Sequence, residues 1–183
     1  MLNLFRRRQP AGTIVSLYGA IVAQARTPAF YAELGVPDTM DGRFDMIVLH
    51  LALAMRRLRA GDAASAQAMQ ELFDIFCRDM DHNLREIGLS DVGVPRKMRK
   101  FGEAFYGRAK VYDQALDAHD AAALADALGR NIFRRPDGAS DGAARCLAAY
   151  VEASDATLAG QEPATIAGGT IRFPEFCVAQ VAR

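Results

Sequence analysis

The sequence predicts an all-α fold, a single-domain helical bundle of about six or seven helices with an extended C-terminal tail. Apolar residues recur at intervals of three and four along most of the 183-residue chain. This spacing is typical of helices that are buried on one face. Candidate capping residues and Gly or Pro breaks separate the apolar stretches. A chain of this length buries roughly 70% of its unfolded surface, which is enough for a substantial core.

Three parts of the chain are expected to differ in structure. Residues 1–12 form a basic N-terminal tail, residues 13–160 form the helical domain, and residues 161–183 form an extended tail that packs on the bundle. The first helix is expected to run from about Thr13 and to stop before Pro28, because a proline disfavours helix at the residue that precedes it.

The next two helices carry the clearest apolar stripes. Asp38 or Asp41 is expected to cap the first of them, and Asp62 the second. Gly88 is expected to follow the second helix in the left-handed conformation. The buried faces are predicted to contain Phe44, Ile47, Val48, Leu51, Met55 and Leu58, and then Met69, Leu72, Phe73, Phe76, Met80, Leu84 and Ile87.

The second half of the chain follows the same pattern. Pro95 fits the first position of a helix, and Asp120 is expected to cap another. A last helix is expected from about Asp141 to Leu158. The inner face of the helix after Pro95 is predicted to contain Met98, Phe101, Phe105, Tyr112 and Leu116. Beyond Gly160 the helical signal weakens, and the aromatic residues there are expected to pack on the bundle from an extended segment.

Composition excludes several classes of protein. Lys plus Arg and Asp plus Glu are equal at 22 each, which argues against a dedicated nucleic-acid-binding protein, DNA-binding proteins included, but says nothing about local patches. The three cysteines are odd in number and far apart, so a reducing compartment is expected. No stretch approaches the ~18 consecutive apolar residues of a membrane-spanning helix. We therefore expect a soluble protein.

The sequence contains little that suggests catalysis. There is no nucleophile elbow, no phosphate-binding loop and no dinucleotide-binding motif. Asp79, His82 and Glu86 lie on one face of a predicted helix, but the second set of ligands that a di-iron bundle needs is missing. A solvated polar face is the favoured interpretation, and we expect no enzyme activity, no cofactor and no metal.

The charge pattern is more informative. From Glu71 to Asp91 there are six acids and two arginines, whereas from Pro95 to Tyr112 there are six bases and one acid. The basic helix begins with Arg96, Lys97, Arg99 and Lys100. Cations at this positive end of a helix cost up to a few tenths of a kcal/mol each. Either the acidic helix offsets them as a hairpin partner, or they face an acidic protein, a membrane surface or ribosomal RNA, and both can hold at once.

Two glycines, Gly102 and Gly107, interrupt the same basic helix. Each costs roughly 1 kcal/mol relative to alanine in a helix. A notch of small residues beside Phe105 is therefore expected. Either another helix of the bundle packs closely in this notch, or the notch is part of a groove for a client helix.

Several motifs carry a family resemblance over roughly residues 13–128. They are Asp-Met-Asp at 79–81, Leu-Arg-Glu-Ile-Gly-Leu-Ser-Asp at 84–91, Pro-Arg-Lys-Met at 95–98 and Phe-Tyr-Gly-Arg at 105–108. With Tyr112, they resemble the ubiquinol–cytochrome c chaperone family. The resemblance implies a non-enzymatic helical chaperone that binds newly made cytochrome b, or another subunit of ubiquinol–cytochrome c reductase, on the cytoplasmic side of a bacterial inner membrane. It leaves contact with the membrane surface or the ribosome open.

Ten residues are candidates for partner binding. Those that match the family motifs are Arg85, Asp91, Lys97, Tyr106, Arg108 and Tyr112. Charge alone adds Arg96, Arg99 and Lys100, and Phe105 is expected to border an apolar groove with Tyr106. Three alternatives remain at this stage: a bundle that binds a quinone or lipid, a metalloenzyme, and a homodimer without a client. The oligomeric state is not predicted.

Overall fold

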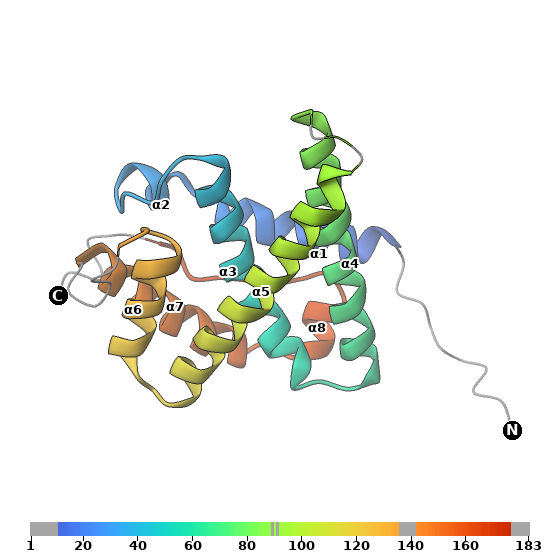
Figure 1. Cartoon of the computed structure of the whole chain (residues 1–183). Coiled ribbons are helices and arrows are strands. Elements are labelled where there is room, and N and C mark those ends of the chain that lie inside the picture. Colours follow the sequence, from blue (N-terminus) through green and yellow to red (C-terminus); the bar gives the residue numbers. More distant parts are fainter. Residues whose placement is uncertain (1–10, 89, 91, 136–141, 177–183) are drawn as a thin grey trace, which may run out of the picture.

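The fold, seen in a computed structural model, is described for residues 11–88, 90, 92–135 and 142–176. Within these ranges the chain has helices and no strand (Figure 1). The helices are α1 (Ala11–Ala25), α2 (Pro28–Ala32), α3 (Met40–Arg59), α4 (Ala63–Glu86), α5 (Gly93–Asp117), α6 (Ala121–Asn131), α7 (Gly142–Ala159) and α8 (Pro163–Ala167). The predicted all-α class is confirmed.

Helix α3 is the centre of the bundle. Every residue from Phe44 to Met55 is buried, because α1, α4, α5, α7 and α8 all pack against this helix. A helix covered on all sides needs apolar residues all round rather than on one stripe. The apolar stripe predicted from the sequence is therefore only part of its buried surface.

Local capping signals were mostly predicted correctly. Asp62 accepts a hydrogen bond from the Ser65 amide at 3.0 Å, and Asp120 accepts one from the Ala123 amide at 2.9 Å. Gly88 has a φ of +84°, as expected for the left-handed residue after a helix. Each signal depends on residues within one turn of the helix end.

The predicted cap of α3 is wrong, and the predicted start of α5 is displaced. Thr39, in an extended conformation, accepts a hydrogen bond from the Gly42 amide, while Asp38 instead accepts one from Arg43. Helix α5 begins at Gly93, so Pro95 is its third residue rather than its first. Proline is tolerated throughout the first turn, where no intrahelical amide bond is lost.

A buried hydrogen-bond chain links α1, α3 and α7. His50 Nδ1 lies 2.8 Å from the carbonyl oxygen of Met46, which can only accept, so Nδ1 carries the proton. Nε2 then accepts from the hydroxyl of Tyr150 at 2.9 Å, and that hydroxyl accepts from Gln24 at 2.9 Å. Complete burial lowers the pKa of His50 to about 4, so the ring is neutral.

Ion pairs join the C-terminal end of α3 to two other helices. The Arg56 guanidinium lies 2.7 Å from Asp117 of α5 and 3.0 Å from Asp155 of α7. Arg59 lies 2.8 Å from Asp113 of α5. These cations also offset the negative end of the α3 dipole.

The described part of the C-terminal segment, residues 161–176, packs on the bundle, but it is not extended throughout. The short helix α8 comes first, and residues 170–176 then run without helix or strand. Gln161 holds this segment: its side chain donates to the Arg172 carbonyl and accepts from the Arg172 amide, at 2.8 and 2.9 Å. Phe176 is buried and stacks on Phe30.

Candidate functional site

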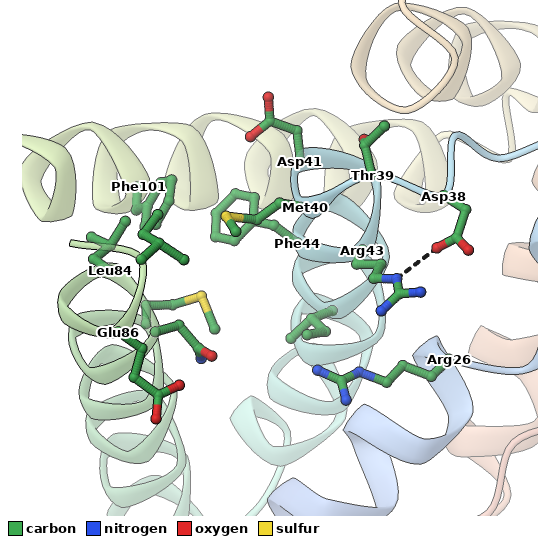
Figure 2. Close-up of a pocket in the computed structure, with 14 residues that line it drawn as sticks. Arg26, Asp38, Thr39, Met40, Asp41, Arg43, Phe44, Leu84, Glu86 and Phe101 are labelled. Carbon is green, nitrogen blue, oxygen red and sulfur yellow. Dashed lines mark hydrogen bonds and ion pairs between the residues drawn. The ribbon is translucent and has the colours of Figure 1, made fainter. Parts of the chain in front are cut away.

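A pocket of about 420 Å³ opens between the start of α3, the end of α4 and the first turns of α5 (Figure 2). Arg26, which follows α1, reaches its edge. The pocket is lined by Arg26, Asp38, Thr39, Met40, Asp41, Arg43, Phe44, Ile47, Met80, Asn83, Leu84, Glu86, Ile87 and Phe101.

The floor of the pocket is apolar. Phe44 stacks on Phe101 with ring centroids 4.3 Å apart, and the side chains of Ile47, Met80 and Leu84 complete it. These residues belong to the stripes predicted as core. The helical period identifies the apolar face of a helix, but it does not show that neighbouring helices leave one end of that face open.

The rim combines exposed apolar and charged side chains. Met40 is 57% exposed and Ile87 49%, so the rim presents two large apolar side chains to solvent. Arg43 forms an ion pair with Asp38 at 2.6 Å, and this contact lowers the pKa of Asp38. Within the described part of the chain, Arg26 forms no ion pair.

The basic cluster, defined as Arg96, Lys97, Arg99 and Lys100, lies at the start of α5 next to this pocket. Lys97 Nζ lies 5.3 Å from the centroid of the Phe101 ring, and Arg99 contacts Glu103 of its own helix at 3.7 Å. No ion pair between the cluster and an acid of α4 is found in the described residues. The hypothesis that the acidic helix neutralises the cluster therefore has no support from the contacts.

The other candidates fall into two groups. Tyr106 is exposed, at 60%, and Arg85 pairs with Asp81 one turn earlier in α4 at 2.7 Å. Phe105 and Tyr112 are each only 2% exposed, so they pack inside the bundle. Asp91 lies outside the described residues.

Arg108 is also internal, and its partner was missed at the sequence level. Its guanidinium lies 2.5 Å from Asp45 of α3, and Arg134 approaches the other oxygen of Asp45 at 2.6 Å. Burial raises the pKa of Asp45 to about 6, although both arginines oppose this effect. Two features of the sequence could have revealed this pair. Asp45 is an acid inside the apolar stretch of α3, and Arg108 falls between Phe105 and Tyr112 at the spacing of the buried face of α5.

The residues considered for a metal site do not converge. Asp79 accepts a hydrogen bond from the Tyr18 hydroxyl at 2.7 Å, whereas His82 and Glu86 contact each other at 3.0 Å. Across residues 11–88, 90, 92–135 and 142–176, no three potential ligands are grouped so as to hold a metal ion. In the same ranges, no helix combines the length and apolarity needed to cross a bilayer.

The glycine notch of α5 is open. A Cβ added at Gly102 or Gly107 would meet no atom within 4 Å. No other helix in the described residues therefore packs closely against these two positions, and close packing inside the bundle does not explain them.

Comparisons with known proteins all lead to one family. A family model described as "Ubiquinol-cytochrome C chaperone" matches residues 32–173. A Xenopus laevis protein, "Ubiquinol-cytochrome-c reductase complex assembly factor 1", is 24% identical over 119 residues, which are 65% of this chain and 59% of that protein. The chain thus spans about three fifths of the length of this relative.

A solved structure extends the likeness to nearly the whole chain. The crystal structure of the Cbp3 homolog from Brucella abortus is 43% identical, covers 97% of each chain and superimposes with a TM-score of 0.84. The family match includes every pocket residue except Arg26.

Proposed function

Because the chain belongs to the ubiquinol–cytochrome c chaperone family, we propose that it is a non-enzymatic chaperone for the assembly of ubiquinol–cytochrome c reductase. Newly made cytochrome b is its proposed client, and the pocket between α3, α4 and α5 is the proposed client-binding site. The observation that supports this assignment is a pocket with an apolar floor, whose rim exposes two large apolar side chains, Met40 and Ile87.

The chemistry of the pocket suits an apolar segment of a membrane protein that has not yet met its partner subunits. Each large apolar side chain that leaves water contributes about 1.5–3 kcal/mol. A pocket of about 420 Å³ takes only a few such side chains. Binding therefore stays weak enough for the client to be released, and the flexible thioethers of Met40 and Met80 can adapt to different side chains.

The charges around the pocket would orient the client segment. Arg26, which forms no ion pair among the described residues, lines the pocket, and Lys97 of the basic cluster lies over the ring of Phe101, another lining residue. Acidic groups that flank an apolar client segment would therefore meet cations beside the pocket. Such pairs contribute more to the rate and specificity of association than to affinity. The proposed place of action is the cytoplasmic side of the inner membrane, where a newly made subunit emerges.

A matched pair of variants tests the proposal. Met40→Glu places a charge at the pocket, whereas Val15→Glu places the same charge on α1 at a side chain with the same exposure, 57%. In a host that lacks its own copy of this gene, Met40→Glu should reduce both co-purified cytochrome b and assembled reductase, and Val15→Glu should not. Equal co-purification with both folded variants would refute the pocket assignment, and normal reductase in the deletion host would refute the function.

A quinone or lipid is a second candidate ligand, favoured by one observation. The volume of the pocket lies within the roughly 300–1,000 Å³ range of small-molecule sites. Solvent extraction of the purified protein followed by mass spectrometry tests this alternative. A stoichiometric quinone or lipid that is lost in Met40→Glu would favour it, and an empty pocket would count against it.

A further inference from the structure

The connection between α4 and α5 exposes apolar side chains at one extreme of the molecule. Val92 is 86% exposed and Ile87 49%. Figure 1 shows the end of α4 and the start of α5, both green, extending beyond the neighbouring helices at this end. We call the described residues Ile87, Gly88, Ser90 and Val92 the hairpin tip.

Cations follow the tip along the outer face of α5. Arg96, Arg99 and Lys100 are exposed, and their spacing of three and four residues places them on one side of the helix. The inner side of the same turns holds Val94 and Phe101 against the bundle. The start of α5 is therefore amphipathic, with apolar residues at the tip and a cationic face behind it.

Most of these cations have no acidic partner among the described residues, although they lie at the end of the helix where a positive charge is least favourable. They lie at the positive end of the α5 dipole, and the N-cap residue Val92 provides no capping side chain. In the described part of the chain, only Arg99 contacts an acid, Glu103 at 3.7 Å. Ser90 already accepts hydrogen bonds from the amides of Gly93 and Val94, and Pro95 has no amide hydrogen. It is therefore the side chains, rather than the helix end, that an anion outside the protein would satisfy.

The combination of side chains distinguishes between possible anionic surfaces. Single-stranded RNA is bound through phosphates together with aromatic stacking platforms, whereas the side chains exposed at the tip, Ile87 and Val92, are aliphatic. Aliphatic side chains beside Lys and Arg are typical of segments that lie at the surface of anionic bilayers. An anionic lipid surface complements both features.

We propose that the hairpin tip docks on an anionic lipid bilayer, with Val92 and Ile87 entering the interface and Arg96, Arg99 and Lys100 contacting lipid phosphates. Ile87 also lines the pocket, so docking holds the pocket next to the membrane surface. The inference rests on the exposed residues of the tip rather than on the identity of the client, and its test contains no client protein.

The chain has no tryptophan, which allows a site-specific test. Val92→Trp places one fluorophore at the tip, and Ala153→Trp places one at an exposed position of α7. Each full-length variant is mixed with vesicles of phosphatidylcholine, alone or with phosphatidylglycerol. Val92→Trp emission should shift to shorter wavelength only with phosphatidylglycerol, and brominated lipids should quench it. Ala153→Trp should show neither effect.

Charge reversal provides the second arm. Arg96→Glu, Arg99→Glu and Lys100→Glu, introduced together in the Val92→Trp protein, should weaken vesicle binding by about tenfold or more. Acids at the start of a helix are favoured by its dipole, so thermal stability should stay equal or rise. An unchanged emission from Val92→Trp on anionic vesicles would overturn the proposal, as would equal shifts at both positions. A response to an RNA oligomer but not to vesicles would also overturn it.

Discussion

His50 Nε2 lies 2.9 Å from the hydroxyl oxygen of Tyr150, and this hydrogen bond joins the central helix α3 to α7 inside the core. Burial acts on both groups: it lowers the pKa of His50 to about 4 and raises that of Tyr150 to about 12. Both side chains are therefore uncharged in the folded protein at neutral pH. The hydrogen bond needs a neutral imidazole, so acidification opposes it.

The stability of the fold should consequently depend on His50 in acid. Its folded-state pKa lies below the value of 6.5 for the free side chain, so the unfolded chain binds more protons between pH 4 and 6.5. Stability from this group is complete above pH 6.5 and falls as the pH drops through that window. The free energy of unfolding of the natural protein, relative to His50→Gln, should be about 2 kcal/mol lower at pH 5 than at pH 7.

Urea unfolding of both proteins across this range measures the difference. Asp45 titrates in the same window with the opposite sign, because its folded-state pKa is raised to about 6, but it is present in both proteins and cancels. A difference between the two proteins that does not change with pH would contradict the assignment.

Asp45 should stabilise the fold through Arg108 more than through Arg134. The Arg108 side chain is 13% exposed and that of Arg134 49%. Asp45→Asn leaves the buried Arg108 without its counter-ion and should cost about 3 kcal/mol. Arg134→Gln removes a more exposed partner and should cost less than about 1 kcal/mol. Denaturant unfolding gives both values, and equal losses would show that the burial of Arg108 does not determine the cost.

Filling the glycine notch should stabilise the protein. An added Cβ meets open space at Gly102, so Gly102→Ala should raise the free energy of unfolding by up to about 1 kcal/mol. Gly42→Ala is the contrasting variant, because its Cβ would clash with the backbone of Pro37, and it should destabilise the protein. Thermal unfolding distinguishes the two. A loss of stability in Gly102→Ala would mean that the notch is filled in solution.

Gln161 should control the order of the C-terminal segment. Gln161→Ala removes the acceptor of the Arg172 amide, whose hydrogen exchange should become about fivefold faster, consistent with a net contribution of ~1 kcal/mol. Gln70→Ala is the control, since that side chain bonds only Asp74 of its own helix among the described residues. If the Arg172 amide exchanges at the same rate in the natural protein, Gln161→Ala and Gln70→Ala, Gln161 does not order the C-terminal segment.

Features governed by neighbouring residues were predictable from the sequence. Asp62, Asp120 and Gly88 act within one turn of a helix end, so their spacing was sufficient. The prediction of the α3 cap failed because three neighbouring residues, Asp38, Thr39 and Asp41, all have suitable capping side chains. The choice depended on Arg43, which engages Asp38, and on the backbone conformation of Thr39.

Features that depend on packing between distant segments were not predictable. Phe44 and Leu84 are buried, as predicted, but their helical period did not show that they also line a pocket. The Asp45–Arg108 pair joins residues 63 positions apart, so a motif that contains Arg108 suggested partner binding when the side chain serves the fold. The binding role of the exposed cations at the start of α5, predicted from charge, stays a prediction.

The central claim is that the pocket beside the α4–α5 hairpin holds newly made cytochrome b. The most direct measurement is photo-crosslinking during synthesis of cytochrome b, with a photo-reactive amino acid in place of Met40, Ile87 or Val15. We predict crosslinks to cytochrome b from positions 40 and 87 and none from position 15. Crosslinks from position 15 alone, or from no position while cytochrome b still co-purifies, would contradict the account.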